Sequence, residues 1–257
     1  MGVDAEYGHM VMAEGAGLQV VAVPAFADNY LWLVHDPDSR ETAVDDPGDG
    51  AAVLAEADAR GWTVDQVWNT HWHPDHTGGN GAVIAATGAT LSAPAAEASR
   101  IPAIDVALKE GDTVRIGSHV GEVWEVPGHT LGHIALIFRG AGVAFVGDTM
   151  FAMGCGRLFE GTPEQMFASL RRLAQLPGET RVYCAHEYTL ANARFAAHAF
   201  PDDEAIAARV ADVSAKRQAA LATVPTTIAA EQATNPFLRA ANAAEFAQLR
   251  MAKDRYS

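Results

Sequence analysis

The residues best suited to chemistry are concentrated in one short segment, NTHWHPDHTGGN, which begins at Asn69. His71 and His73 stand two residues apart, and residues at this spacing on an extended backbone point to the same face. A proline then ends the extended run, so Asp75 and His76 approach the same point from a turn. Four such ionisable groups within six residues would repel one another or stay unpaired without a metal. The segment therefore predicts a metal site.

Three further segments place ligand-type residues at the ends of expected strands: PGHT with His129, GDT with Asp148, and AHE with His186. Strand ends in layered α/β folds meet at one edge, where functional sites collect. Five histidines and two aspartates are too many for one catalytic zinc, which takes three protein ligands. They suit two metals about 3.5–4 Å apart that share one carboxylate and a bridging hydroxide. We expect two divalent metal ions, with zinc first and iron or manganese as alternatives.

Other residues near these motifs are assigned supporting or structural roles. Gly78 and Gly79 are expected to let the backbone pass close by without a Cβ clash. Either Asp45 or Asp46 is expected to orient a ligand histidine, and the sequence does not choose between them. Isolated histidines are interpreted as surface or satisfied residues: His35, His119, His133 and His198.

Composition argues against two classes of partner. The formal net charge of −14 over 257 residues would repel a phosphate backbone across most of the surface, so we expect no nucleic-acid partner. The longest uncharged stretch, residues 77–96, contains four glycines and a proline. It lacks the roughly 20 predominantly apolar residues that a membrane span needs. We therefore expect no membrane partner.

The cysteines and the N-terminal segment indicate the compartment. Cys155 and Cys184 are too few for a disulfide framework and are interpreted as free thiols in a reducing environment. No base is apparent beside Cys155, so we interpret it as a buried small residue and not as a nucleophile. Residues 1–17 lack a basic start followed by an apolar run, so they do not have the pattern of a signal peptide. We expect a cytoplasmic protein and leave this segment out of the fold.

Short apolar, β-rich runs alternate with helical patterns from Leu18 to about His186. Strands grouped in runs and interleaved with helices indicate stacked sheets with helices outside. The expected strands are 20–23, 30–35, 43–44, 64–69, 113–116, 120–126, 134–138, 143–146 and 181–184, and the expected helices are 51–60 and 162–176.

The remaining residues have a different pattern. Residues 205–221 carry an apolar stripe at helical spacing. Asn242 with Glu245 resembles a capping box that opens another helix. No strand pattern is visible here, so we expect a small helical appendage.

The order and spacing of THWHPDHTGGN, PGHT, GDT and a late histidine resemble the metallo-β-lactamase superfamily over residues 18–186. The resemblance implies a four-layer αββα sandwich. It also implies how the ligands divide. One metal would be held by His71, His73 and His129, the other by Asp75, His76 and His186, and Asp148 would bridge them. Asp75 and Asp148 are thus the carboxylates expected to serve catalysis.

Three further segments resemble the glyoxalase II branch, the hydroxyacylglutathione hydrolases, and extend the resemblance to nearly the whole chain. They are GCGRLFEGT, similar to the substrate loop, HEYT, similar to the start of the helical domain, and NPFLR with the terminal RMAKD. The resemblance implies a catalytic domain over 18–186 and a helical substrate-binding domain over 187–257. The residues implied to contact glutathione are Arg157, Phe159, Tyr188, Arg250 and Lys253.

Two of these residues depart from the family pattern. Many members have Lys where Arg157 stands and Tyr where Phe159 stands. Arginine keeps the charge as a planar fork, whereas phenylalanine loses a hydrogen bond worth about 1 kcal/mol.

The charge pattern agrees with the anionic ligand that the resemblance implies. Arg250 and Lys253, three apart on one helix face, repel each other. Their alternative role, complementing a helix C-terminus, is worth only about 0.3–1 kcal/mol. In so acidic a chain the pair favours an anion, and the carboxylates of glutathione fit.

The resemblance implies hydrolysis of an S-2-hydroxyacylglutathione thioester, usually S-D-lactoylglutathione, as in methylglyoxal detoxification. We expect a metal-bridging hydroxide to attack the carbonyl, because two cations lower the pKa of bound water toward neutrality. One metal would stabilise the oxyanion. The leaving thiolate, whose conjugate acid has a pKa of about 8.5, departs without a strong general acid.

Several alternatives use the same fold. A glutathione persulfide dioxygenase, with one iron, would lack the helical tail and the Arg250–Lys253 pair. A metallo-β-lactamase proper usually carries cysteine where Asp148 stands, and the acidic charge disfavours a nuclease. A metal or glutathione sensor would not need an open dinuclear centre. Hydrolysis of another thioester or a lactone also stays open. We expect a monomer.

Overall fold

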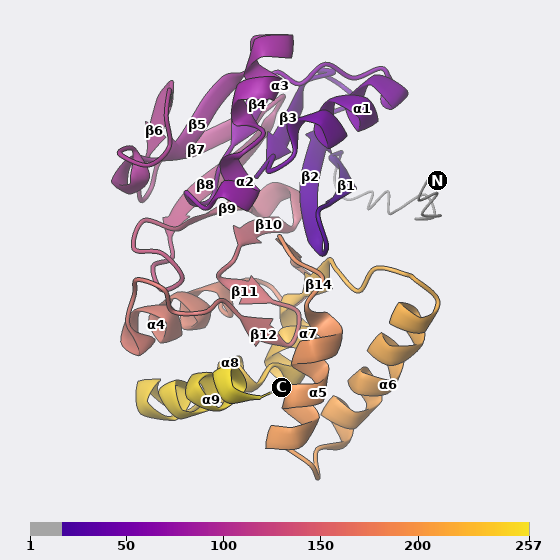
Figure 1. The fold of residues 1–257 in the computed structure, drawn as a ribbon, viewed down its shortest axis with the longest axis vertical. Coiled ribbons are helices and arrows are strands. Elements are labelled where there is room, and N and C mark those ends of the chain that lie inside the picture. Colours follow the sequence, from indigo (N-terminus) through magenta and orange to yellow (C-terminus); the bar gives the residue numbers. More distant parts are fainter. Residues whose placement is uncertain (1–16, 257) are drawn as a thin grey trace.

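Residues 17–256 are described by the computed structural model (Figure 1), in which two six-stranded sheets and a two-stranded hairpin occur. The first sheet contains, in spatial order, β1 (Gln19–Ala25), β2 (Asn29–His35), β3 (Thr42–Asp45), β4 (Gln66–Trp68), β5 (Thr90–Pro94) and β6 (Val106–Leu108). The second contains β14 (Thr226–Thr227), β13 (Arg181–Cys184), β10 (Val143–Gly147), β9 (Ile134–Phe138), β8 (His119–Glu125) and β7 (Thr113–Ile116). The hairpin pairs β11 (Met150–Phe151) with β12 (Gly154–Cys155).

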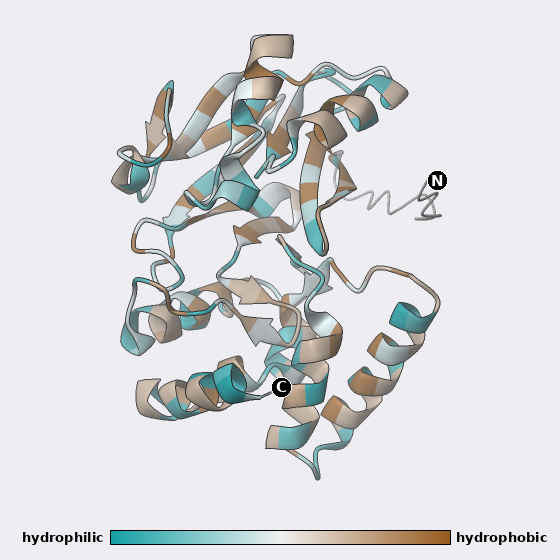
Figure 2. Cartoon of the chain, viewed as in Figure 1, coloured by the Kyte–Doolittle hydropathy of each residue, from teal (hydrophilic) through white to brown (hydrophobic). Residues whose placement is uncertain are grey.

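Strand β1 shows why both faces of the first sheet are covered. Val20 and Ala22 belong to the core that this sheet shares with the second sheet, whereas Val21 and Val23 belong to a separate core on its outer face. Successive side chains of a strand point to opposite faces, so an uninterrupted apolar run requires two apolar neighbours. Strand β2 is buried along its whole length for the same reason, and hydrophobic residues are frequent along these strands (Figure 2).

Helices supply the two outer layers. On the first sheet lie α1 (Gly50–Arg60) and α3 (Asn80–Thr87), which contribute Val53 and Val83 to the outer core. Helix α4 (Pro163–Leu173) contributes Met166 and Leu170 to the core that contains the second sheet. The four-layer αββα sandwich predicted from the sequence is therefore confirmed.

The C-terminal region is helical, as predicted, and lies below the sheets in Figure 1. Its helices are α5 (Thr189–Ala199), α6 (Glu204–Gln218), α7 (Ile228–Thr234), α8 (Pro236–Arg239) and α9 (Ala243–Arg255). The expectation that it has no strand is wrong, because β14 pairs antiparallel with β13. Two paired residues are too few to show the alternation that identifies a strand in sequence.

Several boundaries and elements differ from the prediction. Helix α4 begins with Pro163, as expected, but ends at Leu173. Strands β5 and β6 and helix α3 were not predicted, because the Ala- and Gly-rich residues there have weak periodicity. Asn242 caps α9 by accepting from the Glu245 N–H (3.0 Å), but the Glu245 carboxylate accepts from Ala241 N–H (2.8 Å), so the reciprocal capping box is incomplete.

Among the helices described, none is long and apolar enough to cross a membrane. The N-terminal segment set aside above lies outside the described residues, apart from Gly17.

Candidate metal centre

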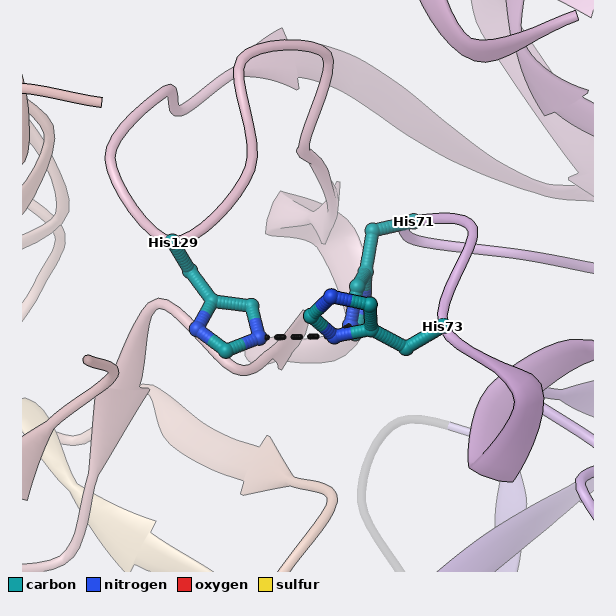
Figure 3. A group of neighbouring side chains, drawn as sticks. All are labelled: His71, His73 and His129. Atoms are coloured by element: carbon teal, nitrogen blue, oxygen red, sulfur yellow. Dashed lines mark hydrogen bonds between the residues drawn. The ribbon is translucent and has the colours of Figure 1, made fainter. Parts of the chain in front are cut away.

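Three imidazoles converge at the edge of the sheets (Figure 3). His71 and His73 lie in the loop after β4, and His129 lies in the loop between β8 and β9. His73 Nδ1 is 3.0 Å from His71 Nε2 and 3.0 Å from His129 Nε2. Nitrogens that face one another at this spacing could hold one metal ion between them.

A second group lies beside the first. Asp75 and His76 belong to the short helix α2 (Pro74–Thr77), and His186 follows β13. Asp75 Oδ2 is 3.5 Å from His76 Nε2 and 3.5 Å from His186 Nε2. These three side chains could hold a second ion.

Asp148, which follows β10, faces both groups. Its Oδ2 is 3.3 Å from His129 Nε2. Its Oδ1 is 3.4 Å from His186 Nε2 and 3.6 Å from His76 Nε2. One carboxylate oxygen is thus directed to each group, the arrangement a bridging carboxylate requires.

Two buried atoms show that this donor set fits bound cations. His76 Nε2 and Asp148 Oδ1 are buried and have no hydrogen-bond partner. Leaving such groups unsatisfied costs about 1–3 kcal/mol each. Although burial opposes ionisation, His186 and His76 hold the pKa of Asp148 below its usual range, so its carboxylate is charged. A divalent cation between the groups would satisfy both atoms.

Hydrogen bonds donated by Nδ1 orient two histidines of different groups. His129 Nδ1 donates to the Arg157 carbonyl (2.9 Å), which leaves Nε2 as the lone-pair nitrogen. His186 Nδ1 lies 3.0 Å from Asp28 Oδ1, so its Nε2 also faces the centre. Such partners fix the tautomer and the ring orientation of a metal ligand.

Asp46 performs the same role for two more histidines. Its Oδ2 lies 2.8 Å from His76 Nδ1 and accepts from Thr70 Oγ1 (2.6 Å). Thr70 Oγ1, having donated its proton, is 3.1 Å from His71 Nδ1 and accepts from it. The choice left open by the sequence is settled in favour of Asp46, whereas Asp45 is fully buried with Oδ1 unsatisfied.

Two glycines allow the loops to close around the centre. A Cβ on Gly79 would lie 2.2 Å from the Pro47 carbonyl oxygen, so the predicted close backbone approach is confirmed. Gly128, just before His129, has φ +154°, and its Cβ would lie 2.7 Å from Met166 Cβ. A side chain at Gly128 would displace this histidine loop.

A cavity of about 430 Å³ opens beside the histidines, with His129 and Asp148 in its wall. The structure brings together there all five residues predicted to contact substrate, namely Arg157, Phe159, Tyr188, Arg250 and Lys253. Tyr188 stacks on His186 with ring centroids 4.6 Å apart, and Phe159 lies 5.2 Å from the His129 ring. The cavity thus joins a cationic wall to the candidate metal centre.

The three cations of the cavity are not equivalent. Arg250 is buried and donates to the Cys155 carbonyl (2.9 Å) and to Asp254 (2.8 Å). Arg157 is exposed, with Nε 3.9 Å from the same Asp254. Lys253 forms no ion pair within residues 17–256. Burial and the charges of Arg250 and Arg157 lower the pKa of Lys253, so this ammonium gains most from an anionic ligand.

Some residues near the centre were not identified from the sequence. His133, interpreted there as a surface or satisfied residue, is fully buried and stacks on His71 at 4.6 Å. Its Nε2 accepts from the Asp148 N–H (3.1 Å), so it is a satisfied core residue that holds the bridging segment. Asn29 donates to Asp75 Oδ2 (3.1 Å) from the turn between β1 and β2. For His133, the local sequence signal was its position four residues after His129 in the segment GHTLGH. No local pattern pointed to Asn29.

The cysteines are structural, as the sequence indicated. Cys155 and Cys184 are both buried and free. Burial raises the pKa of the Cys155 thiol to about 11 and that of Cys184 to about 12. Neither is a nucleophile at neutral pH.

Known proteins resemble both parts of the chain. Residues 28–186 match the metallo-beta-lactamase superfamily, and residues 187–256 match the hydroxyacylglutathione hydrolase C-terminus. The hydroxyacylglutathione hydrolase of Erythrobacter litoralis is 50% identical over 251 residues, covering 93% of this chain and 100% of that protein.

Solved structures share the fold. ETHE1 from Myxococcus xanthus has a TM-score of 0.70 at 26% identity and covers 91% of this chain and 89% of its own. TTHA1623, solved in a di-iron-bound form, has a TM-score of 0.60 at 25% identity and covers 84% of this chain and 98% of its own. The chain belongs to the hydroxyacylglutathione hydrolase family of the metallo-β-lactamase superfamily.

Proposed function

We propose that this protein hydrolyses S-2-hydroxyacylglutathione thioesters, with S-D-lactoylglutathione as substrate, to glutathione and a 2-hydroxy acid. The observation that carries the proposal is the position of Asp148 between two ligand groups, at the wall of a cavity with three cationic side chains. A hydrolytic centre and a site for a tripeptide with two carboxylates thus share one cavity. Family membership over both parts of the chain supports the same activity.

We assign the ligands as the geometry groups them. His71, His73 and His129 would hold one ion, Asp75, His76 and His186 would hold the other, and Asp148, which faces both groups, would be shared between them. The donors are nitrogen and oxygen without thiolate, which suits zinc, with iron or manganese as alternatives. When bound, the two cations lower the pKa of water and polarise the thioester carbonyl.

The protein side chains orient and neutralise the reacting groups. Asp75 and Asp148 would supply negative charge to balance the cations, and Asp148 reaches toward both ligand groups. Asp46 and Asp28 hold His76 and His186 with Nε2 toward the centre. No spare general acid is needed, because a thiolate leaves as a stable anion.

The cavity residues bind the glutathione part. Lys253 and Arg157 pair with its carboxylates, and Arg250 fixes the Cys155 carbonyl that borders the cavity. Tyr188 and Phe159 flank the path to the centre with aromatic surfaces. Phe159 is 62% exposed, so substrate contact would cover apolar surface that now faces solvent.

The organisation proposed for the chain follows from this site. We assign residues 18–186 as the catalytic domain and 187–257 as the substrate-binding helical domain, and the meeting of the two family matches at 186/187 supports this boundary.

Every proposed ligand comes from one chain, which supports a functional monomer. Two buried free thiols support a reducing, cytoplasmic location.

A substrate panel tests the activity. The zinc-loaded protein is assayed with S-D-lactoylglutathione, the corresponding oxygen ester and a homoserine lactone, and the iron-loaded protein with S-D-lactoylglutathione and with glutathione persulfide and oxygen. Turnover of the thioester with kcat/KM at least about 10⁴ M⁻¹s⁻¹ is expected, the lower end of ordinary enzymes. Preference for the lactone, or oxygen consumption with the persulfide, would refute the proposal.

A further inference from the structure

Glu160, which follows Phe159 in the loop between β12 and α4, is bound by three separate segments. Its Oε1 accepts from Trp72 Nε1 (3.1 Å) and from Arg100 Nη1. Its Oε2 accepts from the Leu131 N–H (3.0 Å). One carboxylate therefore joins loops that are far apart in the sequence.

Two of these segments carry proposed metal ligands. Trp72 stands between His71 and His73, and its ring packs edge-on against the His73 ring with centroids 4.6 Å apart. The Arg100 guanidinium also lies over the Trp72 ring, 4.6 Å from the ring centroid. Glu160 thus fixes the indole against which His73 rests.

The second link reaches His129. Leu131 lies two residues after this histidine, and Glu160 holds its N–H. On the same loop Glu97 accepts from Thr130 Oγ1 and from the Gly132 N–H (3.2 Å). The loop therefore has an independent anchor, so loss of Glu160 would loosen His129 without unfolding the loop.

We propose that Glu160 is a positioning residue that holds His73 and His129 at metal-binding distance and locks the Phe159 loop over them. The proposal rests on the proposed function for its substrate, but its metal-binding part does not. Phe159 contacts both rings, 5.7 Å from His73 and 5.2 Å from His129, so the same carboxylate sets the cavity wall against the histidines.

Only a carboxylate matches the donors around it. Trp72, Arg100 and the Leu131 N–H all donate, and two oxygens accept all three. Glutamine would turn an NH₂ toward at least one of these donors and lose that bond. Glu160→Gln keeps the size of the side chain and removes one acceptor, which makes it the informative variant.

The chain offers a matched control on β8. Glu122 accepts from Trp124 Nε1 (3.2 Å) and from Arg139 Nε (3.4 Å), and Arg139 lies 5.2 Å from the Trp124 ring centroid. This glutamate, tryptophan and arginine repeat the arrangement at Glu160 without contact to the proposed ligands. Glu122→Gln therefore reports what the loss of such a triad does by itself.

The experiment measures zinc transfer from the loaded protein to a chromophoric chelator, together with kcat and KM for S-D-lactoylglutathione. We expect Glu160→Gln to release zinc about 10-fold faster and to lower kcat by a similar factor, as loss of groups that orient ligands does elsewhere. Trp72→Phe, which keeps a six-membered aromatic ring but removes the N–H donor, should change zinc release and kcat in the same directions by smaller factors. The double variant Trp72→Phe/Glu160→Gln should differ little from Glu160→Gln in zinc release and kcat, because both substitutions act on the same contact between the indole and the carboxylate.

Two results would overturn the proposal. One is zinc release and kcat in Glu160→Gln equal to those of Glu122→Gln. The other is a raised KM with unchanged zinc release, which would confine Glu160 to the substrate loop. If Glu160→Gln does not fold, Trp72→Phe decides by the same measurements. If wild type fails to hydrolyse the thioester, the proposed function fails, while zinc release still tests Glu160.

Discussion

Replacing Lys253 by methionine separates substrate binding from stability. The ammonium lines the cavity, lies 5.8 Å from the Phe195 ring and 5.9 Å from the Tyr256 ring, and forms no ion pair among the described residues. A hydrogen bond to a charged group contributes about 1.5–3 kcal/mol, and partial exposure places this one near the lower end. The loss of about 1.4 kcal/mol corresponds to a tenfold change. We expect KM for S-D-lactoylglutathione to rise about tenfold with kcat unchanged.

Although Lys253→Met should weaken substrate binding, it should not lower the stability of the fold. Burial and the charges of Arg250 and Arg157 lower the pKa of Lys253 in the folded protein. The unfolded chain therefore holds the proton more tightly, and the ammonium destabilises the fold at pH values below its lowered pKa. This cost declines as the pH rises above that lowered pKa and is gone once the pH exceeds the pKa of the unfolded chain. Lys253→Met should thus keep or raise the melting temperature at pH 7.

The pH dependence of KM provides a second signature. As the pH rises through the lowered pKa of Lys253, the cation is lost, so KM of the wild type should rise and approach that of Lys253→Met. Lys216→Met is the control, because Lys216 is paired with Asp212 (2.8 Å) on α6 and does not line the cavity. An unchanged KM in Lys253→Met, or the same rise in Lys216→Met, would refute this reasoning.

Three further outcomes follow from buried groups. Asp46→Asn should weaken zinc binding about 10- to 100-fold by competition with a chelator, because Asp46 orients His76; unaltered affinity would contradict that role. Gly128→Ala should lower stability by about 1–3 kcal/mol in denaturant titration, because φ is +154° and the new Cβ meets Met166; a neutral effect would show that the loop can shift. A disulfide reagent at pH 8 should leave Cys155 and Cys184 of the folded protein unmodified and modify both after unfolding; rapid reaction in the native state would disprove their burial.

Local motifs made much of the candidate site predictable. His71, His73, Asp75 and His76 fall within six residues, so chain connectivity alone forces them together. The remaining ligand-type residues each follow a strand, and strand ends of stacked sheets share an edge. Patterning also predicted the two sheets, because their strands are short, apolar and bounded by turn residues.

What escaped prediction depends on contacts across the fold. Asn29 meets Asp75, and Glu160 meets Trp72 and Leu131, through tertiary packing that no sequence spacing encodes. The choice of Asp46 over its neighbour depends on a backbone φ of 52°, which turns that carboxylate toward Thr70 and His76. Strand β14 exists only because β13 offers an edge to pair with.

Metal reconstitution tests most directly whether two divalent cations held by this cluster are required for thioester hydrolysis. The protein is stripped with a chelator, dialysed, and titrated with zinc while bound metal and hydrolysis of S-D-lactoylglutathione are measured together. We expect negligible activity in the stripped protein and recovery that saturates at about two ions per chain. Undiminished hydrolysis by the stripped protein, or recovery that is complete at one bound ion per chain, would contradict this requirement.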